Sequence, residues 1–385
     1  MNNNDFVLGI NYWPASKAMY WWKNWEAEEV ETDFKRIAES GFNKVRIFLL
    51  WEDFQPQINK ILLQSIDYLS RTLDIAKKNN IGIMPTFFTG HMSGVNWMPE
   101  WMLTSEDCNS RFEVFSGGEL SKRVIKNFYE DKEIQDAQVY QITEIAKLLK
   151  GHSALWAWDL GNESSNCVIP ESKEQGLVWL KKMVNALKTI DNDKPVSIGL
   201  HMKDLEEDRN LGLVEAGKYC DFVCMHGYPS YCKWAEGNLD TNLIPFLARV
   251  AGWLAQKPVV FQEFGLAVCA NFKSNIEDDS IIVKSEKEAE KYYVKVLEEI
   301  YDVGCIGAFS WCYSDYRAKL WAFPPLDKAI HERFFGLWKY SGEEKSMIRA
   351  VREFGKRTVK QMDWEPEISR EDFYKVGIER LYKSH

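Results

Sequence analysis

Two glutamates in this sequence each stand at the end of a short apolar run. Glu163 follows the run at residues 154–160, and Glu263 follows Val259–Phe261. One glutamate in such a place is more often a solvated loop residue or an ion-pair partner than a catalytic group. A pair is more informative, because cleavage of a glycosidic bond needs one carboxylic acid to protonate the leaving oxygen and one carboxylate to meet the positive anomeric centre. The pair therefore points to glycoside hydrolysis, provided that the fold brings the two glutamates together.

The elements that would bring them together are eight short apolar runs of the kind that form buried strands. The runs are continuously apolar rather than alternating, which is typical of parallel strands covered by helices. They are Val7–Ile10, Val45–Leu50, Ile81–Phe88, Ala154–Leu160, Val196–Leu200, Phe222–Met225, Val259–Phe261 and Cys305–Trp311.

Amphipathic helical patterns lie between these runs. Val30, Phe34 and Ile37 share one helix face, and Ser285–Glu288 has the form of a capping box at the start of another helix. Repeated alternation of strand and helix predicts an α/β protein with a (β/α)8 TIM barrel. The 100 residues from 163 to 263 equal three strand–helix units of about 33 residues, so both glutamates would face one mouth of the barrel.

We expect one catalytic barrel at residues 1–360, with residues 361–385 as a C-terminal extension packed on it. The segment at about 91–130 is longer than a connection needs, and it follows a strand, so it is expected at the active-site face. A doubly wound open sheet is the alternative fold, but the sequence has neither GxGxxG nor GxxxxGK[ST] to support it.

The composition narrows the class of partner. The net charge of −9 disfavours nucleic acid and anionic membrane surfaces. The chain has 16 Trp, 16 Tyr and 21 Phe, and flat aromatic rings suit ligands with apolar faces and polar rims. An oligosaccharide is such a ligand, so we expect an oligosaccharide substrate; the oligomeric state is left open.

The cysteines and the N-terminus suggest no cofactor and no export. Cys220, Cys224 and Cys232 form the one cysteine cluster, and their spacing does not match a paired CxxC zinc site. The start Asn2-Asn3-Asn4-Asp5 lacks the positive region of a signal peptide, and the apolar run after it is too short for a membrane span. We therefore expect no metal, no organic cofactor and a cytoplasmic location.

At this point the sequence resembles the glycoside hydrolases of family 5, the cellulases, β-mannanases and β-mannosidases of clan A, from Gly9 to about Gly355. Asn162-Glu163 is similar to that family's Asn-Glu pair, and Gln262-Glu263-Phe264-Gly265 to its nucleophile motif. The resemblance implies a retaining double displacement in which Glu163 is the acid/base and Glu263 the nucleophile, while Asn162 contacts the sugar 2-hydroxyl.

Other family positions match at further strand ends. The resemblance implies that Arg46, buried in a strand and in need of an acidic partner, holds the nucleophile. It further implies that His91 lines the −1 sugar site, that His226 contacts the sugar and that Tyr228 bonds the nucleophile. Trp311 would stack under the −1 sugar. Each residue alone could be an ordinary core or loop residue, but together they favour a built site.

The sequence differs from the family pattern in two places. The family commonly has Pro after Asn-Glu, whereas Ser164 stands here, which puts the +1 subsite in doubt. The extra aromatic residues Trp21, Trp22 and Trp97 either wall off one end of the cleft or pack loops together.

We expect a retaining β-glycosidase that trims short β-linked manno-oligosaccharides from one end. The alternatives are a cellulase-like β-1,4-glucanase or β-glucosidase, a catalytically silent sugar-binding barrel, and a metal-dependent barrel hydrolase.

Opposite pKa shifts are expected for the two carboxyl groups. Arg46 and Tyr228 beside Glu263 predict a lowered pKa, and a negative neighbour in an aromatic pocket predicts a raised pKa for Glu163.

Overall fold

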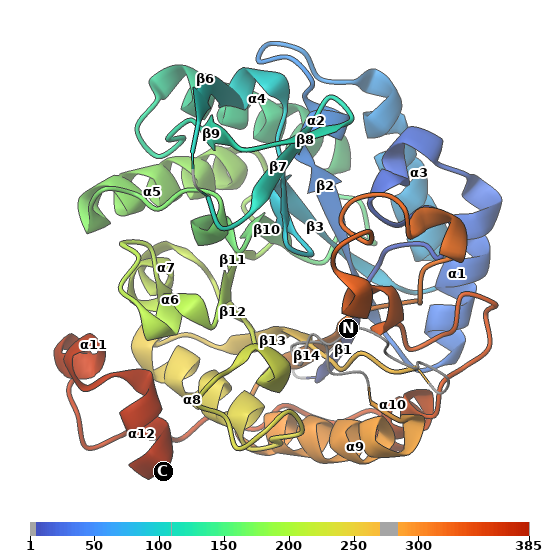
Figure 1. Cartoon of the computed structure of the whole chain (residues 1–385), viewed down its shortest axis with the longest axis vertical. Coiled ribbons are helices and arrows are strands. Elements are labelled where there is room, and N and C mark those ends of the chain that lie inside the picture. Colours follow the sequence, from blue (N-terminus) through green and yellow to red (C-terminus); the bar gives the residue numbers. More distant parts are fainter. Residues whose placement is uncertain (1–4, 109, 270–283, 385) are drawn as a thin grey trace.

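The computed structural model describes residues 5–108, 110–269 and 284–384, and its centre is a closed barrel of eight parallel strands (Figure 1). The strand order around the barrel is β1-β14-β13-β12-β11-β10-β3-β2. Each of the eight apolar runs overlaps one of these strands, so the predicted TIM barrel is confirmed. The strands are β1 (Val7–Asn11), β2 (Lys44–Leu50), β3 (Gly82–Thr89), β10 (Trp158–Asn162), β11 (Val196–His201), β12 (Val223–His226), β13 (Val259–Phe264) and β14 (Gly307–Ser310).

The fourth barrel strand lies closer to Glu163 than the sequence indicated. The run Ala154–Leu160 was expected to form it, but β10 begins at Trp158, and the first half of the run meets β3 only through the isolated bridge between Ile83 and Leu155. Hydrophobicity cannot separate a strand from the buried approach to it, because both are apolar.

Several of the strands that end at the barrel mouth are irregular there, and three of the shifts lie at or beside predicted site residues. The register shifts between Asp159 and Asn162 in β10, between Met225 and His226 in β12, and between Phe261 and Phe264 in β13. Irregularities of this kind re-aim side chains and are common beside active sites. Here they fall on the residues that carry the predicted catalytic groups.

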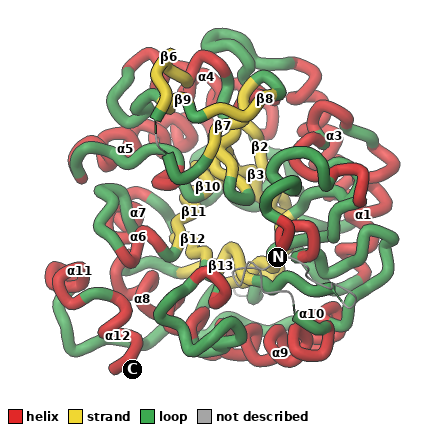
Figure 2. The backbone as a smooth tube through the Cα atoms, viewed as in Figure 1, coloured by secondary structure: helices red, strands yellow, loops and turns green. Residues whose placement is uncertain are grey.

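Helices surround the strands and cover the outside of the barrel (Figures 1 and 2). The predicted capping box is present: the Glu288 carboxylate accepts from the Ser285 backbone N–H at 3.0 Å, and the Ser285 hydroxyl accepts from the Glu288 backbone N–H at 3.4 Å. The main helices are α1 (Ala27–Glu39), α3 (Leu63–Lys78), α4 (Lys132–Leu149), α5 (Lys173–Ile190), α7 (Leu213–Tyr219), α8 (Leu243–Ala255), α9 (Glu286–Asp302) and α10 (Met347–Phe354).

The C-terminal residues lie against one side of this ring, where α11 (Phe373–Val376) and α12 (Ile378–Ser384) are seen next to α8 (Figure 1). The ring centroids of Phe246 in α8 and Tyr382 in α12 are 4.9 Å apart, and the Tyr374 hydroxyl donates to the Asp204 carbonyl oxygen at 2.7 Å. The division into a barrel and an extension at residue 361 stays a prediction.

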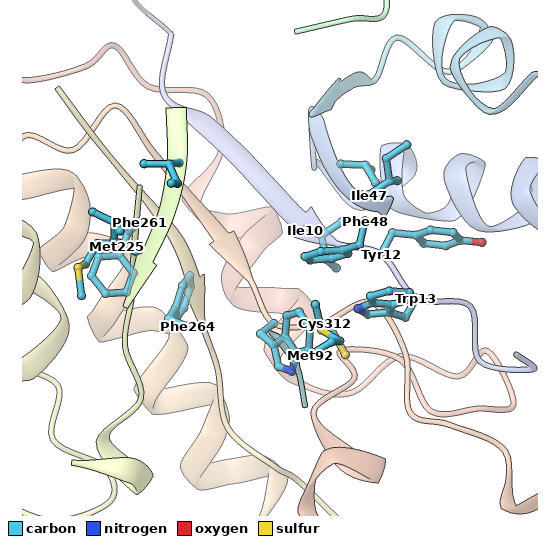
Figure 3. Packing of buried hydrophobic residues seen from close by; sticks show 14 of the residues in the cluster. Ile10, Tyr12, Trp13, Ile47, Phe48, Met92, Met225, Phe261, Phe264 and Cys312 are labelled. Atoms are coloured by element: carbon cyan, nitrogen blue, oxygen red, sulfur yellow. The ribbon is translucent and has the colours of Figure 1, made fainter. Parts of the chain in front are cut away.

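Apolar side chains fill the barrel and the layer around it. The smaller buried cluster lies inside the barrel and consists of Val7, Met84, Ala157, Phe222, Cys224, Val260 and Phe309. Figure 3 shows part of the larger cluster, with Met225 and Phe261 together on one side and Ile10, Phe48 and Trp13 on the other. The rings of Trp13 and Phe48 stack with centroids 4.8 Å apart. A packed interior of this kind makes the strand ends rigid supports for a site.

The long segment after β3 forms its own small sheets over the mouth of the barrel. Trp97 in this segment and the neighbouring Trp21 and Trp22 are at most 5% exposed. None of the three lines the pocket at the barrel mouth, and their rings contact Tyr12, Phe54 and Tyr20, which favours the alternative in which they pack loops together. The strands are β4 (His91–Met92), β5 (Val95–Trp97), β6 (Leu103–Asp107), β7 (Glu113–Ser116), β8 (Glu119–Ser121) and β9 (Arg123–Ile125).

The cysteines, the helices and the N-terminus bear on the remaining sequence predictions. All eight cysteines are free thiols. Among the described residues, no helix is both long enough and apolar enough to span a membrane. The start Asn2-Asn3-Asn4 lies outside the described residues. The cytoplasmic location stays a prediction.

Candidate active site

A pocket of about 320 Å³ opens where the barrel strands end at their carboxyl termini. Its volume is near the small end of the range of small-molecule sites, about 300–1,000 Å³. The structure brings together all eight residues that the sequence proposed. Arg46 lies buried beneath the pocket, and the other seven line it: Glu163, Glu263, His91, Asn162, His226, Tyr228 and Trp311.

Glu263, at the end of β13, is held by a donor on each oxygen. The Arg46 guanidinium donates to Oε1 at 2.6 Å, and the Tyr228 hydroxyl donates to Oε2 at 2.8 Å. Arg46 is fully buried and also pairs with Asp159 at 3.0 Å, which satisfies the acidic partner that its burial demanded. These bonds fix the direction of the Glu263 carboxylate before any ligand enters.

Asn162 bonds to the same arginine. Its side-chain oxygen accepts from Arg46 at 2.8 Å, and its side-chain nitrogen donates to the His91 carbonyl oxygen at 2.9 Å. One N–H of the amide group remains for a ligand, because an amide nitrogen has two donors.

Glu163, just past the end of β10, has a left-handed backbone with φ 49° and ψ 43°. This conformation is uncommon for a residue with a side chain and is typical of functional turns. The chain continues into a 3₁₀ turn, Ser164–Asn166, in which Asn166 folds back and donates to Glu163 Oε2 at 3.0 Å. The serine that stands in the family's proline position thus begins a turn that places a new donor beside the acid/base candidate.

The two glutamates and His226 meet in the pocket, with one atom of each within 4.8 Å of the other two. His226 Nδ1 lies 3.0 Å from Glu163 Oε1 and 3.5 Å from Glu263 Oε1. A cation does not fit this group, because the Arg46 guanidinium already supplies positive charge to the same oxygen of Glu263. The arrangement suits proton transfer and attack by a carboxylate.

The directions of the pKa shifts differ from those expected. Burial raises the pKa of Glu263, an effect that His226 and Arg46 offset only in part. Burial also disfavours the charged form of Glu163, but the charges of His201 and His226 outweigh it and lower the pKa of Glu163. The expected shifts, lowered for Glu263 and raised for Glu163, are therefore wrong for the free pocket, because the histidines around Glu163 were not weighed as charges.

Several pocket residues were missed by the sequence reasoning, among them His201, Asn166, Arg111 and Glu332. His201 carried a usable signal, since it directly follows the apolar run Val196–Leu200 just as His226 follows its own run. Arg111 lies in a loop, and Asn166 and Glu332 lie in short 3₁₀ turns, so no periodic pattern marks them and only the folded chain brings them to the pocket.

Known proteins with related sequences are glycosidases. A family model described as beta-galactosidase matches residues 19–196. Mannan endo-1,4-beta-mannosidase A of Emericella nidulans is 24% identical over 291 residues, which are 68% of this chain and 69% of that relative.

Solved structures with the same fold cover most of the chain. The GH5_18 protein of Streptomyces cattleya, solved in complex with GlcNAc, has a TM-score of 0.75 and 19% identity over 91% of this chain and 79% of its own. The exo-beta-1,4-mannosidase Op5Man5 of the Opitutaceae bacterium strain TAV5 has a TM-score of 0.74 and 24% identity over 91% of this chain and 59% of its own.

The fold, the carboxylate pair and these relatives define a glycoside hydrolase built on a (β/α)8 barrel. The predicted activity on O-glycosidic bonds is confirmed at this level. The predicted resemblance to family 5 is also confirmed, because the similar structures include a member of that family, although the matching family model is another glycosidase family.

Proposed function

We propose that this chain is a retaining β-mannosidase in which Glu263 is the nucleophile and Glu163 the acid/base. The observation that carries the proposal is that carboxylate oxygens of the two glutamates lie within 4.8 Å of each other in one pocket. Retaining glycosidases have carboxyl groups about 5–5.5 Å apart, whereas inverting enzymes leave about 6.5–9.5 Å for a water molecule.

The roles follow from the contacts of each glutamate. Glu263 receives hydrogen bonds from Arg46 and Tyr228 on separate oxygens, which orients it for attack on the anomeric carbon. Glu163 contacts histidines and an amide rather than an arginine, which leaves it able to carry a proton. Trp311 lines the same pocket and offers an aromatic face for the sugar in the −1 site.

The choice of mannosides is supported by the relatives. The curated relative is a mannan endo-1,4-beta-mannosidase, one similar structure is an exo-beta-1,4-mannosidase, and a second GH5_18 structure of Streptomyces cattleya holds Manb1-4GlcNAc. A short oligosaccharide with a β-linked mannose at its end is therefore the proposed substrate.

Removal of terminal sugars is supported by a wall beside Trp311. Glu332, in the 3₁₀ helix Ile330–Phe334, accepts hydrogen bonds from the Trp311 indole at 3.3 Å, the Ser93 hydroxyl at 3.0 Å and the Tyr231 hydroxyl at 3.3 Å. This carboxylate ties together the connections that follow β3, β12 and β14. Connections that are linked in this way favour a closed pocket for one terminal sugar over an open groove for a polymer.

A panel of nitrophenyl β-mannoside, β-glucoside, β-galactoside and β-xyloside tests the proposed function. We expect turnover of the β-mannoside with the highest kcat/KM of the four. Highest activity on the β-glucoside would favour the glucanase alternative. No turnover of any of them, together with binding of manno-oligosaccharides by calorimetry, would favour a sugar-binding barrel without catalysis.

Digestion of β-1,4-mannohexaose tests the terminal mode of action. We expect mannose as the early product, released one unit at a time, if the wall at Glu332 closes the pocket beyond the −1 site as proposed. Chromatography of the first few per cent of conversion checks this. Early mannobiose and mannotriose, or a fast drop in the viscosity of a mannan solution, would show internal cleavage instead.

A further inference from the structure

Three histidines surround Glu163, and the hydrogen-bond network assigns the tautomer of each. His226 Nε2 lies 2.8 Å from the side-chain oxygen of Gln262, whose own nitrogen donates to Asp159 at 2.9 Å. The Gln262 oxygen can only accept, so His226 Nε2 carries a hydrogen. In the neutral ring the other nitrogen, Nδ1, is then an acceptor, and this is the atom 3.0 Å from Glu163 Oε1.

His91 is arranged in the same way with its nitrogens exchanged. Its Nδ1 lies 2.8 Å from the side-chain oxygen of Asn96, whose nitrogen donates to the Asn166 carbonyl oxygen at 3.1 Å. His91 Nδ1 therefore donates, and the bare nitrogen of the neutral ring is Nε2. This atom lies 4.0 Å from Glu163 Oε2.

His201, at the end of β11, completes the set through a relay. The Ser165 hydroxyl donates to Asp204 at 2.6 Å and accepts from Arg209 at 3.2 Å. Because the single hydroxyl hydrogen points to Asp204, His201 Nε2, 3.0 Å from the same hydroxyl, must donate. His201 Nδ1 is left without a hydrogen in the neutral ring and lies 3.6 Å from Glu163 Oε2.

These three assignments share one consequence. Each neutral histidine turns an unprotonated nitrogen towards Glu163, so a proton on Glu163 meets lone pairs on several sides. If the proton instead passes to His226, the ring donates from both nitrogens, to Gln262 and to Glu163. Glu163 with His226 thus holds one proton in either of two neighbouring places, and the raised pKa of His226 and lowered pKa of Glu163 agree with this sharing.

We propose that His201 is a positioning residue for acid catalysis: Ser165 and Asp204 fix its tautomer, so that Glu163, His201 and His226 together hold the proton that leaves with the aglycone. The proposal rests on the proposed role of Glu163. In the first step this proton moves to the leaving oxygen as the glycosidic bond breaks and the bond to Glu263 forms. In the second step the oxygen of a water molecule bonds to the anomeric carbon as the bond to Glu263 breaks, and the proton that this water loses returns to the group. The family motifs account for His91 and His226 but not for His201.

Other charged groups face the same proton. Glu263 from β13 is the nearest negative group, and its own partner Arg46 comes from β2. Arg111 and Lys203 line the pocket from the segment after β3 and from α6 (Lys203–Glu206). None of these groups makes the hydrogen bonds that fix the histidine tautomers, so the relay can be altered without changing them.

The pH profile of kcat/KM on nitrophenyl β-mannoside tests the proposal with His201→Gln and Ser165→Ala. We expect the basic limb to move to lower pH by about one unit in His201→Gln. The limb reports the proton held by the whole group rather than the pKa of the Glu163 carboxyl alone, and the variant removes one of the sites that hold this proton. Ser165→Ala should move it in the same direction by less, since the ring stays but its tautomer is no longer fixed. At high pH both variants should lose less activity on a dinitrophenyl β-mannoside, whose departure needs no acid, than on the nitrophenyl substrate.

His152→Gln is the matched control, because His152 contacts Asp74 at 3.3 Å outside the pocket. It should leave the profile unchanged, and thermal unfolding shows whether each variant is folded. A basic limb that stays in place or moves to higher pH in both pocket variants overturns the proposal. An equal loss on both substrates at all pH values also overturns it, since that result describes only a damaged pocket. If the unaltered chain turns over no mannoside, the proposed function fails first.

Discussion

Glu263→Ala should lose turnover of β-mannosides by about four to six orders of magnitude, and sodium azide should restore part of it. The alanine removes the carboxylate that Arg46 and Tyr228 aim at the anomeric carbon, and the small space left beside them can admit an azide ion. Azide then attacks from the face that Glu263 used, so the product should be an α-mannosyl azide. Proton NMR of the anomeric region identifies it.

The same method applied to the unaltered chain gives the stereochemistry of hydrolysis. We expect β-mannose as the first product, since two displacements restore the original configuration. Glu353→Ala, which removes an exposed glutamate of α10, is the matched control and should keep full activity. First formation of α-mannose would contradict the covalent mechanism and assign Glu263 as a general base instead.

Glu163→Ala should separate substrates by their leaving groups. Turnover of manno-oligosaccharides should fall by about 10² to 10⁴-fold, which is the usual contribution of a general acid. Turnover of dinitrophenyl β-mannoside should stay much closer to the original rate, because that leaving group departs without a proton. Steady-state kinetics on the two substrates measures the difference.

The conservative change Glu163→Gln adds a test by pH. It keeps the size of the side chain and removes its titration, so the basic limb of the pH profile should disappear on nitrophenyl substrates. A basic limb that survives in Glu163→Gln would mean that another group supplies the proton. An equal loss on good and poor leaving groups would mean that Glu163 only shapes the pocket.

The barrel was predictable because its signal is local and repeated. Each barrel strand is a short apolar run, and each run is separated from the next by enough chain for a helix. The boundary error at Ala154–Leu160 arose because the buried approach to β10 is as apolar as the strand. The small strands over the mouth, such as β4 (His91–Met92) and β8 (Glu119–Ser121), are too short to show any period.

The site was predictable where a chemical group ends a strand, as Glu163, Glu263 and His226 do. The barrel itself converts those positions in the chain into neighbours in space. Glu332 could not be predicted, because it reaches Ser93 and Tyr231 only through the folding of three separate loops. The pKa directions could not be predicted either, because they depend on the distances from Glu163 to histidines on different strands.

The left-handed backbone at Glu163 affects which substitutions evolution would favour at this position. A residue with a side chain gives up about 1–2 kcal/mol in this conformation, whereas glycine adopts it freely and asparagine adopts it more readily than most. In a lineage released from selection for sugar cleavage, mutations of Glu163 to glycine or asparagine would remove this backbone cost. Glu163 therefore occupies a backbone position where backbone stability would favour another residue. Its presence there is expected if the side chain is needed for catalysis, and it disfavours the alternative of a sugar-binding barrel without catalysis.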